Sequence, residues 1–108
     1  MYIRFQNSNG DKVLLDVPIK EKYWDDVALI HVTKDLLEFN KTAWQLVDIP
    51  TGLYICWGKT RKECIELFEN KIKERYLNYK SNNAYYYRQK VELQELIKAH
   101  EEGGNKDG

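Results

Sequence analysis

The chain has 108 residues, 17 basic and 17 acidic side chains, and a formal net charge of zero. This length predicts one domain, residues 1–102, followed by a flexible tail at 103–108. No stretch approaches the roughly 18 unbroken apolar residues of a membrane span, and residues 1–4 lack the layout of a secretion signal. We therefore expect a cytoplasmic protein without a membrane partner, in which both cysteines are reduced thiols.

The first predicted element is a β-hairpin over residues 2–17, centred on the Asn-Gly dipeptide at 9–10. A three-residue loop with the glycine in the left-handed conformation would pair Ile3 with Leu15 and give one apolar face. A two-residue loop would pair Ile3 with Asp16 and mix the two faces. We prefer the three-residue loop.

Residues 20–42 show the weakest pattern, and their secondary structure stays open. Residues 20–26, after Pro18, are interpreted as a charged connection. Residues 27–32 form a short apolar run whose length and β-branched content favour a buried strand. Residues 35–39 fit either a helical turn or an irregular link.

A second hairpin and a helix start give the clearest structural pattern. Residues 44–48 and 53–57 are rich in β-branched and aromatic side chains, and the turn at 49–52 combines a proline with a glycine. A capping box follows, in which the Thr60 hydroxyl accepts the Glu63 amide. The Glu63 carboxylate would reach back to the Thr60 amide.

The second half of the chain is predicted to be helical. The first helix carries an apolar stripe at steps of three and four: Ile65, Phe68, Ile72, Tyr76 and Tyr79. Residues 81–83 offer capping side chains for a second helix from 84 to about 100, whose best apolar face is Leu93, Leu96 and Ile97. One unbroken helix of about forty residues is the alternative, because neither Gly nor Pro interrupts residues 60–102. We favour a break near Asn82.

These elements together predict an α+β fold. It would contain an antiparallel sheet of about five strands, made of two hairpins and a middle strand. Two C-terminal helices would follow and pack on the sheet or on each other. The order of the strands in the sheet stays open.

Charge is segregated along the chain. Residues 70–90 carry six basic side chains and one acidic one, whereas residues 91–108 have a net charge of −3. We call residues 71–90 the tyrosine–basic block, because tyrosines alternate with its cations. Its predicted interaction residues are Lys71, Lys73, Arg75, Tyr79, Lys80, Tyr85, Tyr86, Tyr87, Arg88 and Lys90.

Three interpretations of this block stay open. Tyrosine and arginine are typical of protein interfaces, and basic side chains between tyrosines also suit nucleic-acid binding. Plain packing of tyrosines between helices is the third. Since successive helical residues are about 100° apart, Tyr85, Tyr86 and Tyr87 cannot all point the same way, and we expect at least one to be exposed.

Other chemical motifs are weak. Gly58-Lys59-Thr60 matches the end of a phosphate-binding loop, but Leu53 stands where that motif needs glycine, and the cap explains Thr60. Asp25-Asp26 lies in a charged connection where solvated carboxylates are usual.

Cysteine and histidine spacing gives no zinc motif. His31, Cys56, Cys64 and His100 could form a Cys–His catalytic pair only through tertiary proximity. We predict no metal site, no cofactor site and no catalytic residue.

Residues 44–53 and 58–63 resemble a pattern of small accessory proteins from phages and mobile elements of low-GC Gram-positive bacteria. In that pattern a "W-x-V-x-(3 or 4)-T-G" hairpin precedes "G-x-T-(basic)-(basic)-E-A", and this chain has Cys64 in place of the alanine. The resemblance covers about a fifth of the chain and implies no active-site residue. It implies a partner protein in a host or rival element, including inhibition of defence nucleases.

The sequence therefore predicts a small non-enzymatic protein-interaction module, a monomer or homodimer whose partner is another protein. Nucleic-acid binding through the tyrosine–basic block is the alternative. An enzyme would need convergent titratable groups in a pocket, and no motif in the chain predicts one.

Overall fold

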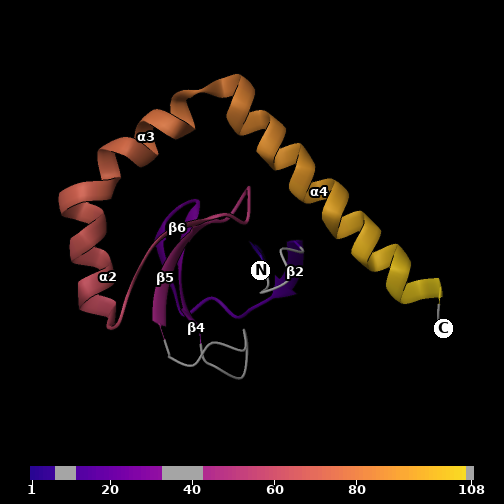
Figure 1. The fold of residues 1–108 in the computed structure, drawn as a ribbon, viewed down its shortest axis with the longest axis horizontal. Helices are drawn as coiled ribbons and strands as arrows, with labels where there is room; N and C mark the ends of the chain where they lie inside the picture. The colour runs from indigo at the N-terminus through magenta and orange to yellow at the C-terminus, as the bar shows by residue number, and fades with distance from the viewer. Residues whose placement is uncertain (7–11, 33–42, 107–108) are drawn as a thin grey trace.

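The computed structural model describes residues 1–6, 12–32 and 43–106 and shows an α+β fold (Figure 1). For residues 5–6, 12–13 and 103–106 it describes the backbone alone. The elements are β1 (Tyr2–Gln6), β2 (Lys12–Asp16), β3 (Glu21–Trp24), β4 (Val27–Val32), β5 (Ala43–Asp48), β6 (Tyr54–Gly58), α2 (Arg61–Leu67), the π-helical turn η1 (Phe68–Ile72), α3 (Lys73–Ser81) and α4 (Asn83–Lys106).

The described strands form two antiparallel sheets. One contains β1 and β2, and the other has the order β3-β4-β5-β6. The predicted register of the first hairpin is confirmed, since Ile3 pairs with Leu15 and Phe5 with Val13. Its predicted loop lies outside the described residues, as do residues 35–39. The buried strand predicted at 27–32 is β4.

The prediction of a charged connection at residues 20–26 is wrong, because β3 lies within it. Glu21 pairs with Leu29 and Lys22 with Ala28, so this short segment adds an edge strand beside β4. Its charged residues hid the strand pattern, since an edge strand faces solvent along one side and tolerates charge. The structure therefore has six described strands where about five were predicted.

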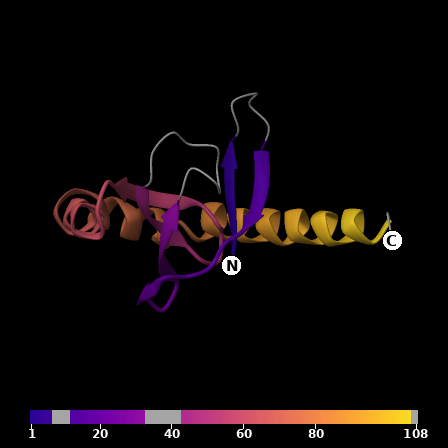
Figure 2. The same ribbon diagram turned by 90° about the horizontal axis from the view of Figure 1, so that it is seen from below.

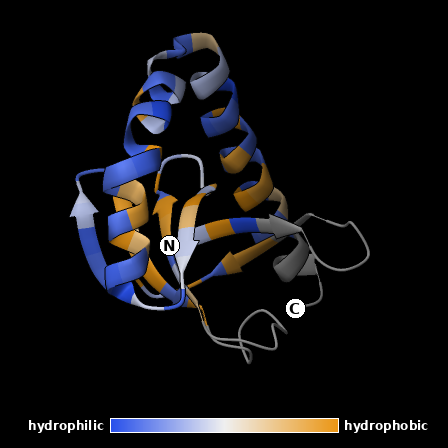
Figure 3. Cartoon of the chain, turned by 60° about the vertical axis from the view of Figure 1, so that its left-hand side comes forward, coloured by the Kyte–Doolittle hydropathy of each residue, from blue (hydrophilic) through white to orange (hydrophobic). Residues whose placement is uncertain are grey.

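The four-stranded sheet has a core on each face. One face packs against the helices through Val27, Leu29, Leu46, Cys56, Cys64, Phe68 and Tyr76. The opposite face packs against the first hairpin through Ile3, Val17, Ile30, Val32 and Val47. Alternate residues of β4 enter alternate cores, as the period of a strand requires. Figure 3 shows apolar segments of the helices facing the strands.

The turn between β5 and β6 fixes the position of α4. Gly52 has φ +70°, a left-handed conformation that glycine adopts without strain in a turn. A side chain at Gly52 would lie 3.0 Å from the Tyr2 carbonyl oxygen and 3.2 Å from Leu93 of α4. The glycine therefore allows β1, the turn and α4 to meet.

The predicted cap of α2 is half confirmed. The Thr60 hydroxyl accepts the Glu63 amide at 3.1 Å. The Glu63 carboxylate accepts the Lys59 amide at 3.1 Å, one residue before the predicted partner. The prediction that it caps the Thr60 amide is therefore wrong, although the side chain does fold back over the helix start.

The helical half bends around the sheet in two places (Figure 1). The π-helical turn η1 holds one extra residue, which brings Phe68 and Tyr76 onto one side with their rings 6.0 Å apart. The helix then ends at Asn82, whose ψ of 82° is not helical. The Asn82 side chain accepts the Tyr85 amide at 3.4 Å, so the predicted break and cap are confirmed and one unbroken helix is excluded.

Helix α4 is longer than predicted. It ends at Lys106 instead of near His100, and in Figure 2 it crosses the first hairpin at a steep angle. Within the described ranges, no helix combines the length and apolar content needed to cross a membrane.

Candidate interaction surface

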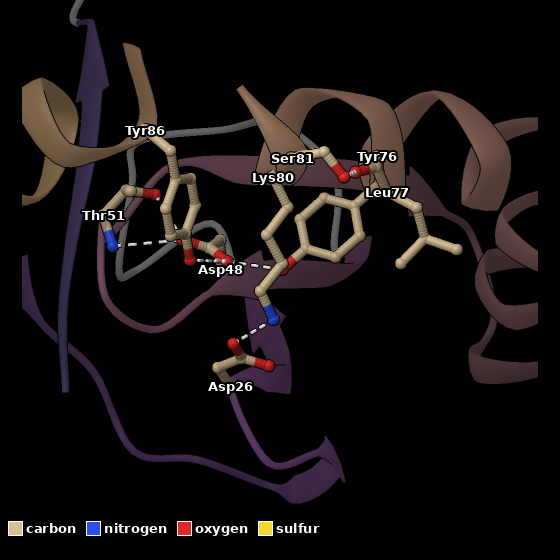
Figure 4. A network of polar contacts seen from close by, with 8 residues as sticks. All are labelled: Asp26, Asp48, Thr51, Tyr76, Leu77, Lys80, Ser81 and Tyr86. Carbon is tan, nitrogen blue, oxygen red and sulfur yellow. Dashed lines mark hydrogen bonds and ion pairs between the residues drawn. The ribbon is translucent and has the colours of Figure 1, made fainter. Parts of the chain in front are cut away.

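The side of the tyrosine–basic block that faces the sheet is held by a buried carboxylate at the end of β5. Asp48 is 1% exposed. It accepts the Thr51 hydroxyl at 2.7 Å and the Thr51 amide at 3.1 Å. The hydroxyls of Tyr86, at 2.9 and 3.0 Å, and of Tyr76 also donate to it (Figure 4). One carboxylate thus joins α3 and α4 to the sheet.

Burial of Asp48 is tolerated because these donors replace the water that a carboxylate would otherwise bind. The same environment changes the pKa of both tyrosines. Burial, followed by the hydrogen bond to Asp48, raises the pKa of Tyr76 and of Tyr86 well above the ordinary value of a phenol. Both hydroxyls therefore stay protonated donors over the physiological range.

Two predicted interaction cations are bound within the protein. Lys80 of α3 forms an ion pair with Asp26, the residue after β3 (Figure 4). Lys73 pairs with Glu69 at 3.2 Å and lies over the Trp24 ring. These contacts neutralise two of the cations that made residues 70–90 basic.

The Glu69 carboxylate also accepts the hydroxyl of Tyr23 in β3. Burial and then this hydrogen bond raise the pKa of Tyr23 to about 12. The Tyr23 and Lys73 hydrogen bonds lower the pKa of Glu69. Glu69 thus links the lysine to the edge strand.

Arg4 of β1 is a second residue that attaches α4 to the strands, and the sequence did not predict it. Its guanidinium donates to the Thr51 carbonyl at 2.9 Å and to the Gln89 carbonyl and side chain at 3.3 and 3.2 Å. It also lies 3.2 Å from the Glu92 carboxylate. No signal in the sequence indicated these partners, since strand alternation places Arg4 on the face opposite Ile3, where a cation is normally solvated.

The outer side of α4 carries the exposed members of the block. Tyr85 and Tyr87 are 45% and 64% exposed, whereas Tyr86 between them is 7% exposed. This division confirms that the three tyrosines cannot face one way. We define the outer patch as the exposed Tyr85, Tyr87, Arg88 and Val91 of the first turns of α4, together with the half-buried Lys90.

Contacts within the outer patch keep its rings in place. The Lys90 ammonium lies 5.3 Å from the Tyr86 ring and 5.9 Å from the Tyr87 ring. The Tyr85 ring meets Tyr79 edge-on at 5.5 Å. A shallow groove of about 360 Å³ continues from the patch along α4, lined by Tyr87, Lys90, Val91, Gln94, Glu95 and Lys98.

Of the remaining predicted interaction residues, two are exposed and one is half-buried. Lys71 and Arg75 are exposed on η1 and α3. Tyr79 is half-buried between the rings of Tyr85 and Tyr86, and its buried hydroxyl makes no hydrogen bond within the described residues. The structure therefore places some of the predicted surface inside the protein and some outside.

The weaker motifs have structural roles. Gly58 ends β6 and Thr60 caps α2, and His31 stacks on Trp44 with ring centres 4.4 Å apart. Cys56 and Cys64 are free thiols, and both are buried. In the described part of the chain, no three His, Cys, Asp or Glu side chains group as metal ligands.

Comparison with known proteins found no matching family model, no matching curated protein and no matching solved structure.

Proposed function

We propose that this chain is a small non-enzymatic protein-interaction module whose outer patch binds a partner protein. The observation that carries the proposal is the exposure of Tyr85 and Tyr87 on either side of the anchored Tyr86. Exposed tyrosines beside Arg88 have the composition of an interface hot spot, where aromatic and arginine side chains dominate binding energy.

The anchored side of α4 supports the same proposal. Tyr86 is bonded to Asp48, and Asn82 caps the first turn, so the helix start is fixed before any partner arrives. A preorganised surface loses less conformational freedom on binding, and more of its contact energy remains as affinity.

The partner we propose is a host protein that the module inhibits or redirects. This part of the proposal rests on the resemblance of residues 44–63 to accessory proteins of phages and mobile elements. It predicts a discrete protein partner with one binding site on the chain.

The test compares three purified proteins as bait in a lysate of the source organism. They are the natural chain, the double variant Tyr87→Ala/Arg88→Ala, and the control Lys62→Ala/Glu66→Ala on the exposed side of α2. A captured partner is then purified and titrated calorimetrically. We expect the patch variant to weaken the Kd by tenfold or more, roughly 1.4 kcal/mol, and the control to change it less than twofold. A specific partner that binds all three equally would reject the outer patch.

Nucleic-acid binding is the second candidate, favoured by one observation. Among the described residues, Lys71, Arg75, Arg88 and Lys90 have no carboxylate partner. Fluorescence anisotropy with labelled single- and double-stranded DNA and RNA across a salt series separates the candidates. Phosphate contacts predict affinity that falls steeply with salt, with a slope reduced by about one in Arg88→Ala. Absence of binding at low salt rejects this candidate.

A further inference from the structure

Two cysteines from different elements meet inside the core between the sheet and the helices. Cys56 lies in β6 and Cys64 in the first turns of α2. The Cys56 thiol contacts the Cys64 carbonyl oxygen at 3.6 Å, and the Cys64 thiol contacts the Cys56 carbonyl oxygen at 3.8 Å. These reciprocal contacts place each sulfur against the backbone of the other cysteine.

A glycine makes this approach geometrically feasible. Gly58 ends β6, and a side chain there would lie 2.5 Å from the Cys64 amide nitrogen, closer than any real side-chain carbon comes. Without that atom, α2 starts directly against the end of the strand it follows. The chain thereby folds back on itself within the nine residues from Cys56 to Cys64.

The two thiols are chemically unequal. The neighbouring Cys56 thiol lowers the pKa of Cys64, burial opposes that effect by raising it, and the Leu46 backbone adds to the lowering. The neighbouring Cys64 thiol, and then burial, raise the pKa of Cys56. We expect Cys64 to react first and Cys56, whose sulfur lies against the Cys64 backbone, to react second.

We propose that Cys56 and Cys64 form a redox-active dithiol that a hydroperoxide converts reversibly to an intramolecular disulfide. With hydrogen peroxide, the Cys64 sulfur attacks one peroxide oxygen, the O–O bond breaks, and a sulfenic acid and water form. The Cys56 sulfur then displaces that oxygen as a second water and forms the S–S bond. Two thiols and one peroxide become one disulfide and two waters.

Burial determines the rate of this reaction. The two cysteines are 4% and 0% exposed, so the oxidant reaches them when the start of α2 opens locally. Slow entry also favours the second step over further oxidation, because the Cys56 sulfur already lies against the Cys64 backbone. The inference stands independently of the proposed function, since it involves no residue of the outer patch.

The test treats the natively folded chain with hydrogen peroxide, quenches it with an alkylating reagent and measures the intact mass. We expect a loss of about 2 Da, reversed by dithiothreitol, because two hydrogens leave. Trypsin cuts between the cysteines at Lys59, Arg61 and Lys62. A disulfide between residues 42–59 and 63–71 therefore appears as one linked peptide that separates on reduction.

The single variants supply matched controls. Cys56→Ser should stop at a sulfenic acid on Cys64, a gain of about 16 Da that a dimedone probe traps. Cys64→Ser should react more slowly than the natural chain. A natural chain that gains oxygen atoms or forms intermolecular disulfides, without the linked peptide, would overturn the proposal; this outcome needs no variant to fold.

Discussion

The two sides of the tyrosine–basic block differ in what their similar residues do. On the side facing the sheet, Tyr76 and Tyr86 donate to buried Asp48, and Lys80 pairs with Asp26. On the outer side, tyrosines and cations of the same kinds face solvent. Composition is thus shared, while the environment uses one set for stability and leaves the other exposed, where we propose that a partner binds.

The Asp48 carboxylate, more than the tyrosines themselves, determines which residues of the tyrosine–basic block are buried and which are exposed. Asp48 is distant in sequence from residues 71–90, yet it selects which tyrosines turn inward. The outer patch is then defined by what remains once the buried acceptors of the sheet are satisfied. Substitutions on the two sides should therefore affect different measurements.

The largest effect should follow Asp48→Asn. An amide offers fewer acceptor sites than a carboxylate, so the Tyr76 and Tyr86 hydroxyls lose charge-assisted hydrogen bonds. We expect the free energy of unfolding to fall by about 3 kcal/mol or more in urea denaturation. The exposed control Asp25→Asn should change it by less than about 0.5 kcal/mol. Equal effects of the two variants would show that Asp48 does not hold the inner side.

The second-largest effect should come from alkaline pH, which should lower the free energy of unfolding through Tyr76 and Tyr86. Folding raises the pKa of Tyr76 and Tyr86 above the ordinary value of 10.0. Above pH 10 the unfolded chain therefore loses protons that the folded chain keeps, and stability falls as pH rises. At pH 11 the loss should be about 1 kcal/mol per tyrosine relative to pH 9.

Urea denaturation at pH 9, 10 and 11 checks this prediction. The double variant Tyr76→Phe/Tyr86→Phe should be less stable throughout and should lose much of the pH dependence. An unchanged slope in that variant would assign the alkaline effect to other groups.

A smaller effect should follow Lys80→Met, which removes the ion pair with Asp26 but keeps the aliphatic stem. Both side chains are about one-third exposed, so solvent screens the pair. We expect a loss of about 1 kcal/mol at low salt that shrinks as salt is added. Arg75→Met on the exposed side should show no comparable loss, and a matching one would contradict the division into two sides.

Local patterns predicted much of the fold. The turn at Gly52, the Thr60 hydroxyl half of the helix cap and the break at Asn82 each depend on residues close in sequence, and each is confirmed. Strand β3 was missed because its short charged segment is held by pairing with β4, a contact that local composition does not contain.

The sequence predicted where the candidate site lies in the chain. It did not predict which residues of the site are buried and which are exposed. Helical geometry alone required the three tyrosines to diverge, and it could not say which one would be buried. That choice depends on Asp48 of β5 and Arg4 of β1, which contact α4 across many intervening residues. The contact between Cys56 and Cys64 was missed for the same reason, because it depends on how closely α2 packs on β6.

The most direct test of the account is the stability of Tyr86→Phe compared with Tyr87→Phe, two identical substitutions at adjacent positions. Each removes one hydroxyl, but only that of Tyr86 bonds a buried carboxylate. We predict that Tyr86→Phe lowers the free energy of unfolding by about 2 kcal/mol and that Tyr87→Phe changes it by less than about 0.5 kcal/mol. Equal losses, or a larger loss for Tyr87→Phe, would contradict the assignment of the two sides.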